Sequence, residues 1–183
     1  MFTYQVDDEI SLALPRPKID GKLLYQLIQE SGEELGVWLP WVSKMNDAKD
    51  EENFLQLVLE HFIKEVSLNV VILYKHQAAG MISFNRFNQV DNSAEIGYWL
   101  GTKFSGKNVV HRAVQAMCSL GFKEYGVNKI EIHAAIDNAR SNHVAQKAGF
   151  TLDGTIRASE LLRDGYHDGN IWTLLKSEWE DGK

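Results

Sequence analysis

The sequence predicts a domain of the mixed α/β (α+β) class, with helices flanking a largely antiparallel, twisted sheet. Segments with the alternation of strands occur on both sides of amphipathic helical segments. In addition, residues 94–122 and 129–150 each pass from a strand through a polar turn into a helix. We find no linker or low-complexity segment, so we expect one domain over residues 1–183.

The first elements are expected to be a hairpin and a helix. Apolar residues alternate within residues 3–14, as is typical of strands, and prolines then interrupt the pattern. Asp20 can cap a helix whose apolar face extends to Ile28. Gly32 and Gly36 are then expected to loosen the chain.

A second helix and a strand pair follow. Asp47 or Asp50 can cap a helix with apolar residues on one side up to Phe62. Residues 69–75 and 78–87 have the composition of two strands around a short turn. A polar link then leads into the next strand, at Ala94.

Residues 94–122 are the most informative segment. Apolar residues alternate over residues 95–100 and recur at helical spacing after the turn. A helix N-terminus carries unpaired N–H groups and a partial positive charge, and Gly106 lets a phosphate approach these donors closely. Lys103 and Lys107 add to the attraction. The segment therefore predicts a site for a phosphate-bearing cofactor.

The last third repeats this arrangement once and closes with a hairpin. Residues 129–150 form the second strand-turn-helix unit, which ends at Gly149, a typical helix stop. Residues 151–162 and 170–176 read as a hairpin around a turn at 163–165. A dinucleotide site is disfavoured, because no G-x-G-x-x-G follows a first strand.

Composition and charge exclude several classes of function. The net charge of −6 argues against sequence-independent nucleic-acid binding and mildly favours a cationic acceptor. The single cysteine, Cys118, excludes an intrachain disulfide and is expected to be a buried thiol. The histidines lack ligand-like spacing, so no metal is expected. Without a secretory signal or an apolar run of membrane-spanning length, we expect a cytoplasmic protein with no membrane partner.

Several short motifs together are typical of one family. They are WLPWV at 38–42, EIGYWL at 95–100, FSGK at 104–107, DNARS at 137–141, KAGF at 147–150 and LRDGYHD at 162–168. With these motifs the chain resembles the GCN5-related N-acetyltransferase (GNAT) superfamily, and within it the RimJ/RimL-type ribosomal-protein N-terminal acetyltransferases. The resemblance implies a GNAT-like sheet with splayed central strands, acetyl-CoA as acetyl donor and, as is frequent in that group, a homodimer.

The resemblance implies that backbone N–H groups of the glycine turn hold the pyrophosphate of acetyl-CoA. Asn108 stands where the family usually has glycine, but asparagine tolerates a positive φ. Gly97 permits a splay or bulge, so the backbone of the next residues can bind the thioester carbonyl and pantetheine. The expected cofactor-binding residues are Trp99, Leu100, Phe104, Ser105, Gly106, Lys107, Asn108, Val109, Asn138 and Ser141. Lys107, Arg112 and Arg140 are candidates for the CoA phosphates or for solvated surface charge.

Acetyl transfer to an amine requires a neutral amine, donors for the oxyanion and a proton for the thiolate. Glu160 matches the glutamate proposed as general base in the resembling group, and a solvated carboxylate is the alternative. Ser141 stands where that group is thought to use a serine to protonate the thiolate, and helix capping is the alternative. The superfamily's usual tyrosine position is Ala145 here. The amide of Asn138 can bind pantetheine or form an Asx turn.

The acceptor side is less determined by the sequence. Trp38 and Trp41 can line a substrate groove or plug the core, and Tyr166 and His167 can contribute to the acceptor site. The leading hypothesis is direct acetyl transfer from acetyl-CoA to the N-terminal α-amine of a protein, whose pKa near 8 demands less of the base than a lysine does. Two alternatives stay open: an acetyltransferase for a small amine (a polyamine, amino sugar or antibiotic), and a non-catalytic CoA-binding regulatory module.

Overall fold

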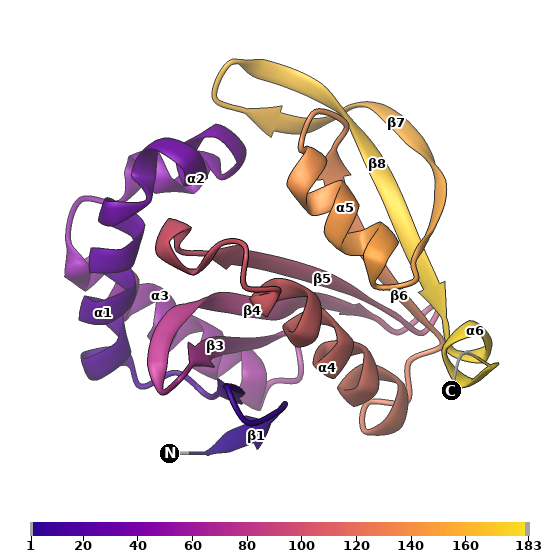
Figure 1. Ribbon diagram of the computed structural model, residues 1–183, viewed down its shortest axis with the longest axis horizontal. Coiled ribbons are helices and arrows are strands. Elements are labelled where there is room, and N and C mark those ends of the chain that lie inside the picture. Colours follow the sequence, from indigo (N-terminus) through magenta and orange to yellow (C-terminus); the bar gives the residue numbers. More distant parts are fainter. Residues whose placement is uncertain (1, 182–183) are drawn as a thin grey trace.

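A computed structural model describes residues 2–181 of the chain. The strands form one sheet of eight, in the order β1-β2-β3-β4-β5-β6-β8-β7 (Figure 1). Neighbouring strands are antiparallel except β5 and β6, which are parallel. The predicted class, a mixed fold with a largely antiparallel sheet, is therefore confirmed.

The elements follow one another in the chain with short connections. In order they are β1 (Thr3–Gln5), β2 (Ile10–Ala13), α1 (Pro17–Glu30), α2 (Gly32–Trp38), the 3₁₀ helix η1 (Pro40–Lys44), α3 (Ala48–Ile63), β3 (Leu68–Tyr74), β4 (Gln77–Asn88), β5 (Ser93–Leu100), η2 (Thr102–Phe104), α4 (Val109–Lys123), β6 (Lys129–Ala135), α5 (Ala139–Lys147), β7 (Thr151–Leu162), β8 (Gly165–Leu175) and α6 (Lys176–Asp181).

The start of α1 corrects one expectation. The helix begins at Pro17, and Arg16, not Asp20, occupies the cap position. Proline suits the first helical position because its fixed φ is already helical. Asp20 lies inside the first turn, 1% exposed, and accepts a hydrogen bond from the Arg16 backbone N–H at 2.6 Å. A carboxylate inside the helix therefore provides the hydrogen-bond acceptor for the backbone N–H of the cap residue.

Two further expectations about local structure were wrong. Gly32 and Gly36 do not loosen the chain but belong to the short helix α2. The strand expected to end at Lys176 gives way there to α6, where Glu178 accepts a hydrogen bond from the Leu175 backbone N–H. By contrast, the cap of α3 is confirmed, because Asp47 accepts from two backbone N–H groups of the first turn.

The helices cover both faces of the sheet. Helices α1 and α3 pack on one face and α4 and α5 on the other. The first face is closed mainly by Leu24, Leu55, Val58, Val71, Leu73 and Met81, and the second by Ile72, Ile82, Ile96, Val114 and Met117. Cys118 is completely buried in the second core, and burial raises the pKa of its thiol. The expected buried thiol is confirmed.

The sheet opens between its two parallel strands. The ladder between β5 and β6 covers only residues 93–95 and 129–131. Beyond these residues β5 continues to pair with β4, and β6 continues to pair with β8. The two halves of the sheet therefore diverge, as expected for splayed central strands, and leave backbone groups of β5 free to bind a ligand.

Candidate active site

The turn before α4 has the backbone conformation of an anion site. Gly106 and Asn108 both have positive φ, 76° and 57°. Asn108 therefore adopts the left-handed conformation expected of it. It precedes the helix without capping it, and its Oδ1 instead accepts a hydrogen bond from Nζ of Lys147 at 2.9 Å. The Asn108 side chain thus leaves the N–H groups of the first turn open, where an anion binds.

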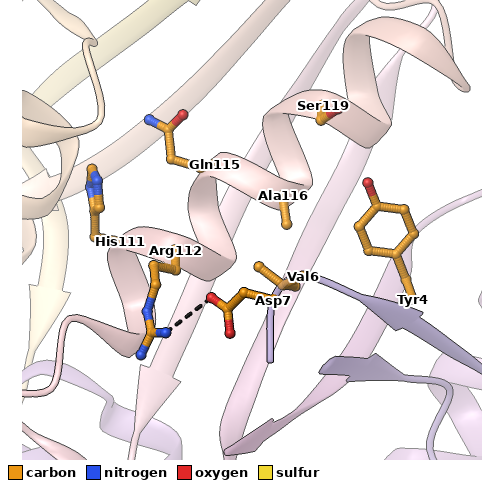
Figure 2. Close-up of a pocket in the computed structure, with 8 residues that line it drawn as sticks. All are labelled: Tyr4, Val6, Asp7, His111, Arg112, Gln115, Ala116 and Ser119. Atoms are coloured by element: carbon orange, nitrogen blue, oxygen red, sulfur yellow. Dashed lines mark hydrogen bonds and ion pairs between the residues drawn. The ribbon is translucent and has the colours of Figure 1, made fainter. Parts of the chain in front are cut away.

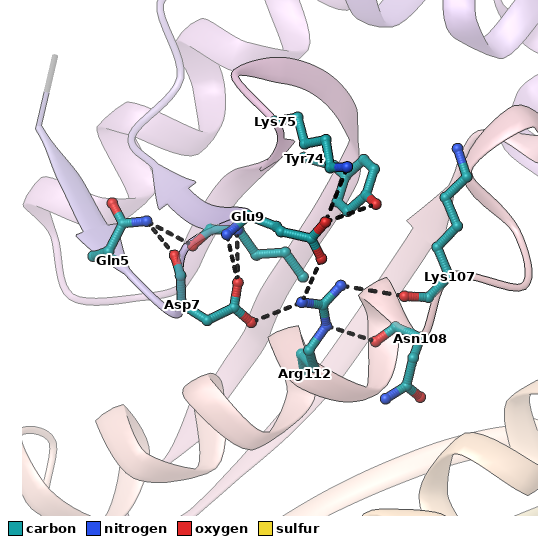
Figure 3. Close-up of polar contacts among 9 residues, drawn as sticks. Gln5, Asp7, Glu9, Tyr74, Lys75, Lys107, Asn108 and Arg112 are labelled. Carbon is teal, nitrogen blue, oxygen red and sulfur yellow. Dashed lines mark hydrogen bonds and ion pairs between the residues drawn. The ribbon is translucent and has the colours of Figure 1, made fainter.

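Arg112 is bonded to this turn, as Figure 3 shows. Its Nη1 contacts a carboxylate oxygen of Asp7 at 3.0 Å and one of Glu9 at 3.1 Å. Its Nη2 and Nε donate to the backbone carbonyls of Lys107 and Asn108. Because the peptide unit is planar and trans, these carbonyls direct the N–H groups of Asn108 and Val109 away from Arg112. Arg112 thus positions the donors of the turn, and its charge is paired.

The other candidate cations and turn residues lie around the same place. Nζ of Lys107 lies 5.4 Å from the ring centroids of Tyr74 and of the buried Phe104. Lys103, by contrast, forms an ion pair with Glu30 at 2.9 Å. Ser105 is exposed and Val109 is buried. Among these lysines, Lys107 is the one better placed to meet a phosphate.

At the end of β5, the backbone N–H and C=O groups of successive residues point alternately toward β4 and toward the opening. The N–H of Gly101 donates to the carbonyl of Ala79, on the β4 side. Since alternate strand residues point to opposite edges, Trp99 also faces β4, whereas Tyr98 and Leu100 face the opening. Of the two residues expected to bind the thioester, Leu100 thus offers its backbone to the opening.

A hydroxyl pair bridges the opening. Asn138 caps α5 by accepting from the Ser141 backbone N–H at 3.1 Å, so Asn138 and not Ser141 is the cap. The contact of the Asn138 amide with pantetheine stays a prediction. The freed Oγ of Ser141 lies 2.9 Å from the hydroxyl oxygen of Tyr98 on β5. Burial raises the pKa of Tyr98 to about 12, so its hydroxyl keeps its proton at neutral pH.

Tyr98 is a candidate site residue that the sequence reasoning missed. Its place in the alternation of residues 95–100 predicted only a strand position. A tyrosine on the strand that carries the opening, with a serine on the following helix, was the available signal. Ala145 stands at the tyrosine position expected from the resemblance, whereas Tyr98 places a phenol at the opening from a strand.

Glu160 lies at a bulge of β7, opposite His167 of β8. It is half-buried, and no side-chain hydrogen bond is formed by its carboxylate within residues 2–181. Burial raises its pKa, and the nearby carboxylate of Glu95 adds to this effect while His133 opposes it. A raised pKa brings a carboxylate closer to the range in which a general base is effective.

The four residues expected on the acceptor side do not gather in one place. Trp41 packs edge-to-face on Trp99, with ring centroids 6.3 Å apart, and both line a cavity of about 460 Å³. Trp38 is half-buried at the end of α2 and does not line this cavity. Tyr166 is 72% exposed. His167 bonds to Asp164 and to Asp137, and these contacts raise its pKa.

Arg140 spans two parts of the molecule. Its guanidinium forms an ion pair at 2.8 Å with Glu34, which links α5 to α2. The arginine is therefore paired in this structure, as Arg112 is.

A second cavity, of about 360 Å³, lies against the outer side of α4 (Figure 2). Tyr4 and Asp7 of the N-terminal segment face His111, Gln115 and other residues of the helix there. This cavity shares Arg112 with the phosphate turn but contains none of the residues expected to carry out transfer.

Within residues 2–181 no three side chains of His, Cys, Asp or Glu are grouped as metal ligands would be. Nor does any helix in this part of the chain have the length and apolar character needed to cross a membrane.

Comparisons with known proteins agree with this geometry. The family of acetyltransferase (GNAT) domains matches residues 12–151. The chain is 32% identical to the putative ribosomal N-acetyltransferase YdaF of Bacillus subtilis, over the whole of both chains. It is 30% identical to the ribosomal-protein-serine acetyltransferase of Escherichia coli, over 84% of this chain and 86% of that protein. Among solved structures, the microcin C7 self-immunity acetyltransferase MccE, in complex with acetyl-CoA and AMP, is 32% identical, with a TM-score of 0.88 over 93% of this chain and 94% of the other.

Proposed function

The chain belongs to the GNAT acetyltransferase family, and we propose that it transfers the acetyl group of acetyl-CoA to the N-terminal α-amine of a ribosomal protein. The choice of acceptor is supported by the full-length similarity of this chain to a putative ribosomal N-acetyltransferase. The choice of reaction rests on one observation above all. The opening between β5 and β6 has a hydroxyl pair across it, Tyr98 and Ser141, and a phosphate turn before α4.

On the donor side, we assign acetyl-CoA to the opening of the sheet. Backbone N–H groups of Asn108 and Val109, positioned by Arg112, bind its pyrophosphate. The backbone N–H of Leu100 at the free edge of β5 is available to the thioester carbonyl, on which negative charge develops during attack. A fixed donor at that place lowers the barrier because it need not reorganise.

On the acceptor side, Glu160 removes a proton from the α-ammonium group. The neutral amine then attacks the thioester carbon, and the carbon–sulfur bond breaks when the tetrahedral intermediate collapses. Ser141 donates its hydroxyl proton to the leaving thiolate, and Tyr98, at 2.9 Å, replaces that proton. The second proton of the attacking nitrogen, released as the amide forms, passes through solvent and restores the phenol of Tyr98. An α-amine has an ordinary pKa near 8, so a carboxylate with a raised pKa suffices as its base.

One observation favours a second candidate function, acetylation of a small molecule. The MccE acetyltransferase, which is named for self-immunity to microcin C7, is as similar in sequence as the putative ribosomal enzyme. The cavity walled by Trp41 and Trp99 is large enough for a small ligand.

The two functions are separated by offering both kinds of acceptor. The purified protein is incubated with acetyl-CoA and ribosomal proteins that lack N-terminal acetylation, or with a panel of small amines and aminoacyl nucleotides. Intact-mass and peptide mass spectrometry then locate any acetyl group. Acetylation of one N-terminus supports the proposal, and transfer to small amines alone supports the second candidate. If the protein binds acetyl-CoA tightly, releases free CoA only slowly and acetylates no acceptor of either set, both functions are contradicted and a regulatory CoA-binding module is favoured.

A further inference from the structure

The cavity beside Trp99 has one unusual lining residue, Glu51. This residue occupies the face of α3 that packs on the sheet, together with Leu55 and Val58 at helical spacing. It is 2% exposed, and its Oε1 is fully buried without a hydrogen-bond partner within residues 2–181. An apolar residue would cost less at this position, because a buried carboxylate without a partner is unfavourable.

The walls around Glu51 suit a positive charge. Four of the lining residues are aromatic, namely Trp41, Phe54, Tyr98 and Trp99, and aromatic faces attract cations. Asp50 also lines the cavity, and hydrogen bonds from Asn46 lower the pKa of its carboxyl group, so it is anionic.

The remaining polar lining residues leave this charge uncompensated. Lys44 is exposed, and within residues 2–181 it is the one cationic side chain that lines the cavity. The other polar lining side chains, Asn69, Ser83, Asn85 and Tyr98, are uncharged at neutral pH. With two carboxyl groups against one ammonium group, a cationic ligand fits better than an anion.

The cavity and the proposed reaction site share Tyr98 of β5, which lines the cavity and whose hydroxyl lies 2.9 Å from Oγ of Ser141. Gly97 also lines the cavity, and a Cβ there would come within 2.6 Å of the amide of Asn85. Asn85 in turn donates to Oε1 of Glu95 at 3.0 Å, and Glu95 lies close enough to Glu160 to affect its pKa. A molecule bound in the cavity therefore lies against both Tyr98 and Glu51.

We infer that this cavity is an acceptor subsite in which Glu51 binds a second cationic group of the acceptor, an ammonium or guanidinium group a few residues from the amine that is acetylated. The inference rests on the proposed function and adds to it the charge of the acceptor. It assigns Glu51 to specificity, with no part in proton transfer. Burial raises the pKa of this carboxyl to about 7, so a bound cation would draw it fully into its charged form.

The test uses matched acceptor peptides. Each begins with the same N-terminal serine and carries either lysine or its uncharged isostere norleucine at the second, third or fourth position. We expect the wild-type protein to show a KM about 10-fold lower for the lysine peptide than for its norleucine twin at one of these positions. Glu51→Gln keeps the shape of the side chain and should abolish this preference, leaving kcat and the KM for acetyl-CoA within about 2-fold.

The control variant is Glu60→Gln, which removes an exposed carboxylate from the same helix and should keep the preference. Binding of both peptides to the protein–CoA complex, measured by calorimetry, gives a readout that needs no acetyl transfer.

Equal KM values for lysine and norleucine peptides at all three positions would overturn the inference. A preference for the lysine peptide that persists in folded Glu51→Gln would also overturn it. In both cases the proposed acetyl transfer would remain supported, because peptides are still acetylated. If no peptide is acetylated, the proposed function fails, and peptide binding measured by calorimetry then tests whether the cavity is a cation subsite. Tighter binding of a lysine peptide that requires Glu51 supports it, and equal binding refutes it.

Discussion

Replacement of Glu51 by glutamine should make the stability of the protein less dependent on pH. The carboxyl group is 2% exposed, and burial raises its pKa from 4.5 to about 7. Below pH 4.5 the group is neutral in both the folded and the unfolded protein, so ionisation contributes nothing. As pH rises from 4.5 to 7, the unfolded chain ionises first, and the folded state loses stability relative to it.

The magnitude follows from the two pKa values. At about 1.4 kcal/mol for each pKa unit, the step from 4.5 to about 7 corresponds to about 3 kcal/mol of stability lost above pH 7. Glutamine does not titrate, so this loss is absent from Glu51→Gln. The variant's free energy of unfolding, relative to wild type, should therefore rise by about 3 kcal/mol between pH 4.5 and pH 8.

Chemical denaturation at several pH values measures this difference, and thermal melting gives a second readout. For a chain of this length, about 3 kcal/mol corresponds to a widening of the Tm difference by about 6–12 °C. Titration of the other groups, Asp50 beside the cavity included, is common to both proteins and cancels. Glu60→Gln should follow the wild-type pH profile. A difference between Glu51→Gln and wild type that stays constant from pH 4.5 to 8 would refute the assignment of a raised pKa to Glu51.

The remaining predictions concern the reaction and its donor. Glu160→Gln should lower turnover by about 10² to 10⁴ with recovery at high pH, where more of the amine is already neutral; a loss that pH does not relieve would argue against the base. Ser141→Ala and Tyr98→Phe should each lower kcat, and a higher pH should not restore it. If the two hydroxyls form one relay, the fold-loss in kcat of the double variant should be smaller than the product of the two single fold-losses. A double-variant loss equal to that product would show that the two hydroxyls act independently. Gly106→Val should raise the Kd for acetyl-CoA by about 10-fold or more in calorimetry, because it adds a branched side chain at a φ of 76° beside the phosphate donors. Gly126→Val, at a φ of 67°, carries similar backbone strain and should leave this Kd unchanged.

Local pattern was enough to predict most of the elements and the phosphate turn. Strand alternation and helical spacing depend on neighbouring residues alone, so the two strand-turn-helix units are visible in the sequence. The positive φ of Asn108 was also predictable, because few other residues tolerate it. Local reasoning was wrong at Asp20, which lies inside the first turn and accepts a hydrogen bond from the backbone N–H of Arg16, the residue at the cap position.

The sequence by itself determined the class of fold, the phosphate turn and the family, because each depends on short-range pattern or on motifs that can be read in order. The tertiary structure alone decided which side chains meet. Tyr98 and Ser141 are 43 residues apart in the chain, and Arg112 reaches Asp7 over 105. Such contacts depend on strand register and on the divergence of β5 and β6, which no local period encodes. The same holds for Glu51, whose helical position is visible in the sequence but whose cavity exists only where α3 meets β4 and β5.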